Sequence, residues 1–259
     1  MQVAILCGGY GTRLKEETEF KPKPMVRVGE RPILWHIMKH YAHFGIRDFI
    51  LVLGYKGEMI KDYFFNYEML NSDVTIEIGR PDSLTIHRKT DEIGWKITLA
   101  DTGEKTLKGG RLKRIERYIT GDKFMMTYGD GVSTVDLDAL QKFHNSHGKI
   151  ATVTGVSPAA RFGELALQGD RVMSFSEKPK GGGEYINAGF FVFDRKIFDY
   201  LSPQEDCDFE YGALEKIAQQ GQLMIWRHEG FWGCMDTQRD ADALNKAWSE
   251  GVAPWKLWP

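Results

Sequence analysis

Apolar and polar residues alternate along this chain in two patterns, and each pattern predicts a different element. Short runs of consecutive apolar residues, such as residues 49–53, are typical of strands that are covered on both faces. In longer stretches, such as residues 32–44, the apolar side chains of Ile33, Ile37 and Tyr41 recur every four residues and would share one face of a helix. The pattern therefore predicts strands that alternate with amphipathic helices.

The same two patterns place the individual elements. Strands are predicted at residues 2–6, 49–53, 74–78, 95–99, 124–128, 150–156, 164–167, 172–175, 186–193 and 223–228. Helices are predicted at residues 32–44, 58–70, 112–119, 136–147, 196–201, 211–219 and 239–250. Residues 80–110 are polar and rich in Gly and Thr, and the strand at 95–99 is the one element predicted there.

The order of these elements predicts the fold. Strands and helices alternate through residues 1–156, which predicts a mostly parallel sheet with right-handed crossovers. Strands follow one another more closely in residues 157–237, which predicts a small β subdomain, and residues 238–259 add a helix and a tail. We therefore expect one α/β domain over residues 1–259, a Rossmann-like, mostly parallel mixed sheet flanked by helices, with that subdomain and C-terminal helices.

Composition narrows the range of partners. The 259 residues carry a formal net charge of −2, which argues against a nucleic-acid or anionic-membrane surface as the main partner. No apolar run approaches the roughly 20 residues that a membrane helix needs. Cys7, Cys207 and Cys234 are far apart and lack metal-ligand spacing, so we expect reduced thiols in a cytoplasmic protein.

The turn after the first strand has the most specific chemistry. Gly8, Gly9 and Gly11 leave backbone N–H groups open to a phosphate, and Arg13 adds a positive charge. In Lys21-Pro-Lys-Pro-Met25 the prolines keep both lysines extended. The spacing fits neither the dinucleotide-binding fingerprint nor the P-loop. A glycine loop with convergent cations predicts a polyphosphate site, although Gly-Gly-x-Gly alone also occurs in ordinary tight turns.

Two aspartates follow strands at distant points of the chain. Asp130 lies between Gly129 and Gly131 at a predicted strand end, and Asp236 follows another strand. In parallel sheets such ends face the crevice where ligands bind. Two hard carboxylates suit Mg²⁺, which leaves its other positions to water and phosphates. Taken singly, each aspartate could belong to a turn or a cap, and Asp236 could cap the last helix with Thr237.

Two motifs in the second half could bind another phosphorylated ligand. Pro179 keeps Lys178 extended as a point charge for a monophosphate, and Glu177 can accept hydrogen bonds from hydroxyl groups. Asn187 offers a donor and an acceptor to a pair of hydroxyls, and Gly189 lets a ligand approach closely. Both motifs could also be ordinary turns, at the surface or at the start of a strand.

Taken in order, these motifs resemble those of the sugar-1-phosphate nucleotidyltransferases over nearly the whole chain. Within this family the chain is similar to the branch that uses CTP and glucose 1-phosphate. That branch usually has Trp-Gln-Pro-Met-Asp-Thr where this chain has Trp232-Gly-Cys-Met-Asp-Thr237, and Glu-x-Glu-Pro-Leu where it has Glu210-Tyr-Gly-Ala-Leu214. The resemblance includes Cys7-Gly-Gly-Tyr-Gly-Thr-Arg-Leu14, Lys21-Pro-Lys-Pro-Met25, Gly109-Gly-Arg-Leu-Lys-Arg114 and Thr127-Tyr-Gly-Asp-Gly-Val132.

The resemblance implies a role for each candidate residue. Residues 1–156 would bind the nucleotide, and residues 157–237 the sugar phosphate. Arg13, Lys23 and Asp130 would be catalytic, and Asp130 and Asp236 would hold Mg²⁺ as the cofactor. The residues implied to bind nucleotide are Leu6, Gly8, Gly9, Gly11, Thr12, Arg13, Lys23, Thr106, Gly110, Arg111, Tyr128 and Gly129. Those implied to bind the sugar phosphate are Gly163, Glu177, Lys178 and Asn187.

The implied reaction joins CTP to a sugar 1-phosphate. The phosphate oxygen of the sugar is already an anion, so it can attack the α-phosphorus in line without a general base. Thr106 and backbone groups would read the cytosine, and Arg111 would donate to the base or to the phosphates, unless residues 101–111 form a flexible lid without contact to the base. The resemblance also implies a homo-oligomer, with a hexamer as the expected assembly.

Three questions stay open at this point. The same mechanism could use UTP, dTTP or another phosphorylated acceptor. The chain could also be a silent module that senses sugar nucleotides, although Arg13, Asp130 and Asp236, which such a module would be expected to lose, are all present. The tail Trp255-Lys-Leu-Trp258 needs a surface to cover, its own or a neighbour's.

Overall fold

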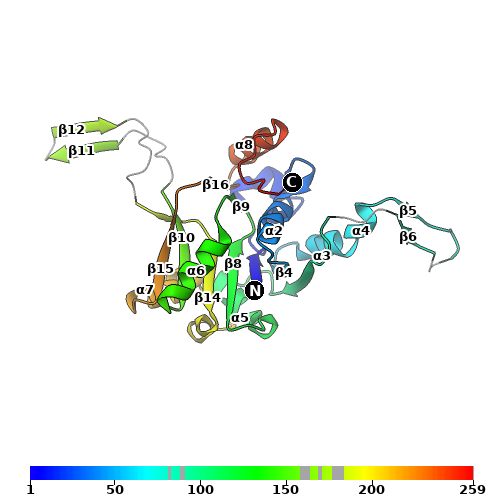
Figure 1. Ribbon diagram of the computed structural model, residues 1–259, viewed down its shortest axis with the longest axis horizontal. Helices are drawn as coiled ribbons and strands as arrows, with labels where there is room; N and C mark the ends of the chain where they lie inside the picture. The colour runs from blue at the N-terminus through cyan, green and yellow to red at the C-terminus, as the bar shows by residue number, and fades with distance from the viewer. Residues whose placement is uncertain (81–82, 88–90, 158–163, 169–170, 177–183, 259) are drawn as a thin grey trace.

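The computed structural model describes residues 1–80, 83–87, 91–157, 164–168, 171–176 and 184–258. Its centre is an eight-stranded sheet with helices on both faces (Figure 1). Along the sheet the strand order is β13-β10-β14-β8-β1-β4-β7, and β15 pairs with β10. The described fold confirms the predicted α/β class with a mostly parallel, mixed sheet.

The strands fall into two groups. The main sheet contains β1 (Gln2–Leu6), β4 (Asp48–Leu53), β7 (Lys96–Asp101), β8 (Lys123–Tyr128), β10 (Ala151–Val156), β13 (Ile186–Asn187), β14 (Phe191–Asp194) and β15 (Leu223–His228). The short pairs are β2 (Arg27–Val28) with β3 (Arg31–Pro32), β5 (Val74–Thr75) with β6 (Thr85–Ile86), β9 (Gly131–Ser133) with β16 (Trp232–Cys234), and β11 (Glu164–Gln168) with β12 (Arg171–Ser176).

Helices connect and cover these strands. The α-helices are α1 (Lys15–Thr18), α2 (Ile33–His43), α3 (Gly57–Phe65), α4 (Tyr67–Leu70), α5 (Lys108–Arg114), α6 (Leu137–His147), α7 (Glu215–Gln219) and α8 (Gln238–Ser249). Short 3-10 turns occur at η1 (Thr12–Leu14), η2 (Lys23–Met25), η3 (Glu116–Tyr118) and η4 (Arg195–Tyr200), and η5 (Phe209–Leu214) is a π-helix. None of the helices in the described ranges is long and apolar enough to cross a membrane.

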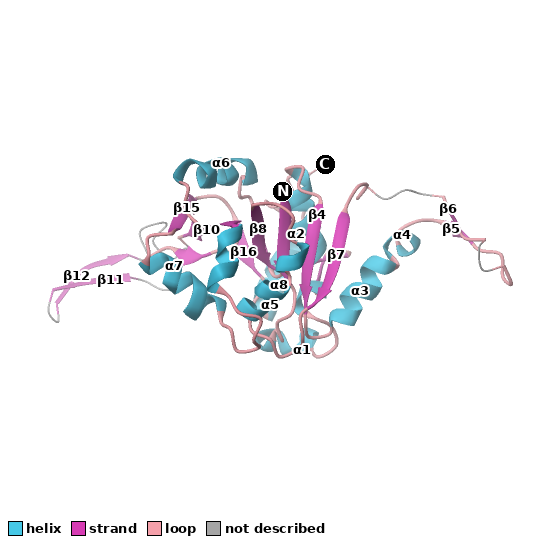
Figure 2. Ribbon diagram, turned by 90° about the horizontal axis from the view of Figure 1, so that it is seen from below, coloured by secondary structure: helices cyan, strands magenta, loops and turns pink. Residues whose placement is uncertain are grey.

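The parallel part of the sheet positions the candidate loops. Strand β1 lies between β4 and β8 and runs parallel to both, and β7 continues this arrangement beyond β4. Their carboxyl ends therefore meet at one edge, where Figure 2 shows α1 close to the arrowheads of β4 and β7. Strand β14 runs antiparallel between β8 and β10, and this makes the sheet mixed.

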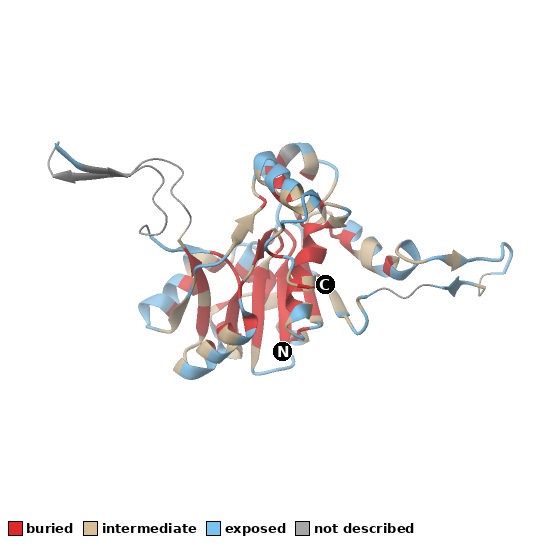
Figure 3. Cartoon of the chain, turned by 45° about the horizontal axis from the view of Figure 1, so that its top comes forward, coloured by how far each residue is buried: buried red, intermediate tan, exposed pale blue. Residues whose placement is uncertain are grey.

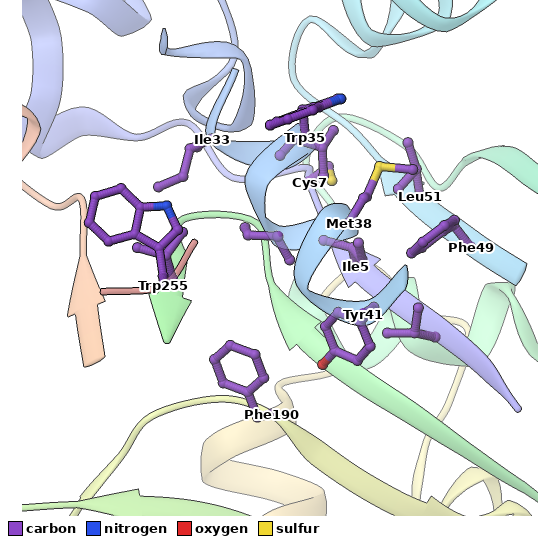
Figure 4. Close-up of a cluster of buried hydrophobic side chains, with 14 of the residues drawn as sticks. Ile5, Cys7, Ile33, Trp35, Met38, Tyr41, Phe49, Leu51, Phe190 and Trp255 are labelled. Carbon is purple, nitrogen blue, oxygen red and sulfur yellow. The ribbon is translucent and has the colours of Figure 1, made fainter. Parts of the chain in front are cut away.

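Apolar side chains cover both faces of the sheet, and its central strands are the most deeply buried part of the fold (Figure 3). On one face, α2 packs over β1 and β4, with Met38 and Tyr41 directed at Ile5 and Phe49 (Figure 4). The C-terminal tail joins this cluster, because Trp255 is 1 % exposed. The predicted need for a covering surface is thus met by the chain's own helix α2.

Several predicted elements differ from the structure for local reasons. The predicted strand at residues 186–193 is split into β13 and β14, because Gly189 and Phe190 both have positive φ angles, 79° and 51°. Helix α5 begins at Lys108 instead of residue 112, although glycine disfavours helix interiors. Gly109 and Gly110 lie against the backbone of residues 204–208, where a Cβ would collide with carbonyl oxygens at 2.7 and 2.2 Å. Close packing therefore overrides the local preference.

The predicted β subdomain is divided between two places. Strands β13, β14 and β15 extend the main sheet, whereas β11 and β12 form a separate hairpin that lies away from it in Figure 1. The β5–β6 hairpin lies at the opposite end of the molecule (Figures 1 and 2).

Candidate active site

A cavity of about 380 Å³ lies beyond the carboxyl ends of β1 and β8. The glycine loop, the Lys-Pro-Lys-Pro segment, residues 104–108 and the end of β8 form its walls. These segments are far apart in the sequence, and the fold brings them together around one cavity. Predicted site residues that line the cavity are Leu6, Gly8, Gly9, Gly11, Thr12, Arg13, Lys23, Thr106, Arg111, Tyr128, Gly129, Asp130 and Asp236.

The glycine loop has the shape that its sequence predicts. Gly11 has a φ angle of 63°, and a Cβ there would lie 2.7 Å from the Thr18 side chain. A Cβ on Gly8 would lie 2.3 Å from the guanidinium of Arg111. Within the described part of the chain, the backbone N–H groups of Gly8, Gly9 and Gly11 find no acceptor. They are available to the oxygens of a bound phosphate.

Hydrogen bonds from Arg111 connect the glycine loop to neighbouring segments. Arg111 is 4 % exposed, and its four terminal N–H groups donate to protein oxygens at 2.9–3.0 Å. The acceptors are the carbonyls of Gly8, Leu53 and Glu104 and the hydroxyl of Thr102. For Arg111 to donate to the base or the phosphates as predicted, it would have to break one of these bonds or use its remaining Nε–H group.

Lys23 joins the two predicted metal ligands. Its Nζ lies 2.6 Å from Oδ2 of Asp130 and 2.6 Å from Oδ1 of Asp236, while Arg13 Nη1 lies 2.9 Å from Oδ2 of Asp236. Burial would lower the pKa of Lys23, but the carboxylate of Asp130 and the hydrogen bonds to both aspartates outweigh it, so the pKa is raised. Likewise, burial would raise the pKa of Asp236, but the Lys23 ammonium reverses the effect and lowers it. Lys23 and Asp236 are therefore both charged at neutral pH.

Strands β9 and β16 bring Asp130 and Asp236 together. They pair antiparallel with Cys234 opposite Gly131, and the N–H of Met235 donates to the carbonyl of Asp130 at 2.9 Å. The alternative role of Asp236 as a helix cap is not what the structure shows. Thr237 caps α8 in a reciprocal capping box with Asp240, which leaves the Asp236 carboxylate to Lys23 and Arg13.

The donor set around these aspartates fits a divalent cation. One ligand atom each from Asp130, Cys234 and Asp236 lies within 4.8 Å of the others. Two carboxylate oxygens suit Mg²⁺. Cys234 was not among the predicted site residues, because a cysteine without spacing to other ligands gives no signal in the sequence. Burial, together with the nearby Asp130 carboxylate, raises the pKa of the Cys234 thiol.

A second polar network lies where β8 faces the second half of the chain. The hydroxyl of Tyr128 donates to Glu210 at 2.9 Å and accepts from Asn187 Nδ2 at 3.1 Å. Lys108 forms an ion pair with the same Glu210 carboxylate and lies over the Tyr128 ring. Burial and the Glu210 charge raise the pKa of Tyr128, so this hydroxyl stays protonated. The sequence had marked Tyr128 and Asn187 but neither Lys108 nor a functional role for Glu210.

Further positions complete the comparison with the predicted site residues. Asn187 is exposed on β13, and its Oδ1 accepts from the N–H of Gly189 at 2.9 Å. Gly110 does not line the cavity, since it packs against the carbonyl of Gln204. Thr106 lines the cavity and accepts from Arg114 at 2.8 Å. Gly163, Glu177 and Lys178 lie outside the described residues.

Comparison with known proteins is consistent with this geometry. The chain is 49 % identical over 259 residues to the glucose-1-phosphate cytidylyltransferases of Salmonella typhi and of Salmonella typhimurium, with all of each chain covered. The solved structure of HddC from Yersinia pseudotuberculosis superimposes with a TM-score of 0.65 at 24 % identity, covering 95 % of this chain and 99 % of that one. The model of the family described as nucleotidyl transferase matches residues 2–237. The chain therefore belongs to the nucleotidyl transferase family.

Proposed function

We propose that this protein is a glucose-1-phosphate cytidylyltransferase, which converts CTP and α-D-glucose 1-phosphate into CDP-glucose and diphosphate. One arrangement carries the proposal. Lys23 joins Asp130 and Asp236 at the mouth of a glycine loop, and this places cations and carboxylates where a triphosphate would lie. The full-length similarity to enzymes of that name supports the choice of substrates.

The chain's own residues would act mainly by binding and by neutralising charge. The free N–H groups of the glycine loop would hold the phosphates of CTP, together with Thr12 and Arg13. The Arg13 side chain is 74 % exposed, so it can turn from Asp236 to a phosphate without loss of packing. An oxygen of the sugar phosphate then attacks the α-phosphorus in line, and the diphosphate leaves. The sugar C–O bond is untouched, and no general base is needed because the nucleophile is an anion.

Asp130 and Asp236 would hold Mg²⁺, which would supply positive charge at the α-phosphate when bound. In the structure the Lys23 ammonium pairs with both carboxylates, and Arg13 pairs with that of Asp236. Lys23 therefore has to release at least one carboxylate to admit the cation. Its ammonium would then be free to bind a phosphate oxygen, so that two cations, Mg²⁺ and the Lys23 ammonium, lie near the reacting groups.

The base and the sugar phosphate would be bound by different segments of the chain. Residues 101–111 would read cytosine, with Thr106 and backbone groups nearest to the cavity. A mismatched base would leave polar groups unpaired at about 1–3 kcal/mol each, so two mismatches give roughly 10²-fold discrimination. Lys178 would bind the sugar phosphate, with Gly163, Glu177 and Asn187 around the sugar. For Gly163, Glu177 and Lys178, which lie outside the described ranges, this role is supported by the sequence motifs alone.

A substrate panel tests the proposal. The protein is incubated with Mg²⁺, each of CTP, UTP and dTTP, and several sugar 1-phosphates, and released diphosphate is measured. We expect the fastest release with CTP and glucose 1-phosphate, and CDP-glucose as the product by mass spectrometry. Equal rates with UTP at subsaturating concentration would refute the base assignment. No release with any pair would favour a module that only binds sugar nucleotides.

We also propose that the enzyme is a homo-oligomer, with a hexamer as the expected size. Large apolar side chains are exposed on α3 and on the β5–β6 hairpin, including Phe65 at 88 % and Ile78 at 96 %. Large apolar side chains that are this exposed favour contact with another chain. Sedimentation of the full chain measures the assembly, and a monomer at all concentrations would contradict it.

A further inference from the structure

The position of Cys234 relative to the two aspartates follows from the β9–β16 pairing. Cys234 ends β16 opposite Gly131, the residue after Asp130. Side chains two residues apart in an extended segment point to the same side, so Cys234 and Asp236 share a face. The sulfur of Cys234 and one oxygen each of Asp130 and Asp236 lie within 4.8 Å of one another. A single cation could contact all three atoms once the Lys23 ammonium has released the carboxylates.

This donor set is unusual for a magnesium site. Carboxylate oxygens are hard ligands and suit Mg²⁺, whereas sulfur is a soft ligand that favours Zn²⁺, Cd²⁺ and other thiophilic cations. The thiol therefore adds a soft ligand for thiophilic cations, which the two carboxylates alone would lack.

We propose that Cys234 is a third metal-binding residue, and that it makes this site prefer thiophilic divalent cations over Mg²⁺. The inference rests on the metal site of the proposed function. When such a cation binds, a metal–sulfur bond forms and the thiol proton passes to the buffer, with no change in oxidation state. Mg²⁺ is held by Asp130 and Asp236 without the sulfur. Cd²⁺ or Zn²⁺ would compete with Mg²⁺ and be held more tightly.

A Cd²⁺ titration of the full chain without nucleotide tests this assignment. A bond between Cd²⁺ and thiolate gives a charge-transfer absorption in the ultraviolet, which carboxylate ligands do not give. We expect the band in the wild type and in Cys207→Ser, the control for the other partly exposed thiol. We expect its loss in both Cys234→Ser and Cys234→Ala, with Cd²⁺ affinity lowered at least about tenfold, the scale on which single groups around a metal change its affinity.

A second variant tests whether the sulfur and the carboxylates bind the same ion. Asp236→Asn should weaken Cd²⁺ binding and its thiolate band together, because both ligands hold one ion. A band that survives in Cys234→Ser, or one that Asp236→Asn leaves at full affinity, would overturn the inference. Neither result would bear on CDP-glucose formation with Mg²⁺, which the substrate panel tests separately.

Discussion

The proposed nucleotide side of the site and its proposed sugar side hold their polar side chains in different ways. On the nucleotide side, Lys23 and Arg111 are largely buried and bonded to protein oxygens, with Lys23 12 % exposed. On the sugar side, Asn187 is exposed on a strand of two residues, although it is linked to Glu210 through Tyr128. One side is therefore rigid before substrate binds, and the other is open.

This difference indicates what each side would contribute to substrate binding and to the reaction. Fixed donors cost no reorganisation when charge develops, so the nucleotide side is suited to the phosphoryl chemistry. Exposed side chains contribute less energy each, and a site made of them can change its ligand by small substitutions. The departure at Gly212-Ala213 is expected to act mainly on the sugar side, whereas Cys234 lies beside the two proposed metal ligands. Substitutions on the nucleotide side should therefore have the larger effects.

The largest effect is expected from the carboxylates. Asp130→Asn and Asp236→Asn keep the side-chain size but remove the charge that would hold the cation. We expect kcat/KM to fall by an amount that corresponds to a loss of about 3–4 kcal/mol of transition-state stabilisation. This is the scale of other preorganised charge contacts. Asp242→Asn on the exposed face of α8 is the matched control and should keep its rate. Near-normal Mg²⁺-dependent turnover in Asp130→Asn would contradict the assignment.

Arg111→Met tests the rigidity of the nucleotide side. The substitution leaves the carbonyl of Glu104 without a donor, whereas those of Gly8 and Leu53 each lose one donor and keep backbone donors from Tyr55 and Thr102. A buried unpaired acceptor costs about 1–3 kcal/mol. We expect a loss of that size in the free energy of unfolding, measured with urea, and a raised KM for CTP. The exposed Arg117→Met should be neutral. An unchanged free energy of unfolding in Arg111→Met would show that the loop does not depend on this residue.

Lys23→Met separates metal binding from catalysis. In the wild type the Lys23 ammonium would compete with a metal cation for the carboxylates of Asp130 and Asp236. Its removal should increase the affinity for Mn²⁺ without nucleotide by about 1 kcal/mol or more, even though turnover is lost. Calorimetry measures this affinity, and Lys21→Met in the same motif is the control, since Lys21 pairs with Glu17 instead. Weaker Mn²⁺ binding in Lys23→Met would exclude competition at this position.

The smallest effect is expected on the sugar side. Asn187→Ala removes one exposed donor and one exposed acceptor, and a neutral hydrogen bond contributes about 0.5–1.5 kcal/mol. We expect the KM for glucose 1-phosphate to rise several-fold while the KM for CTP stays unchanged. Initial-rate kinetics with each substrate varied in turn gives both values. A larger change in the KM for CTP would remove the distinction between the two sides.

Local signals in the sequence predicted most of the nucleotide side. The first strand, the glycine loop and Lys23 follow one another within 25 residues, so their spacing alone predicts that they lie together, as they do around the cavity. The contact of Asp130 with Asp236 depends on β9 and β16, two strands of three residues separated by about a hundred positions. Elements this short leave no periodic pattern, so only the family resemblance could suggest that these carboxylates meet.

The role of Arg111 could not be predicted for a different reason. A charged side chain in a polar stretch is expected at the surface or at a ligand, and burial of a guanidinium needs acceptors from several distant segments. Here those acceptors come from the ends of β1 and β4 and from residues 102–104. Such a set of carbonyls exists only once the sheet has formed.

The central claim is that an oxygen of the sugar phosphate attacks the α-phosphorus of CTP at this site. An isotope label tests it most directly: glucose 1-phosphate carries heavy oxygen in the bridge between C1 and phosphorus, and the products are analysed by mass spectrometry. We predict that the label stays in CDP-glucose, between the sugar and its phosphate, and that the released diphosphate contains none. Label in free phosphate, or in the diphosphate, would mean that the sugar C–O bond or the sugar phosphate had been cleaved, and would contradict the account.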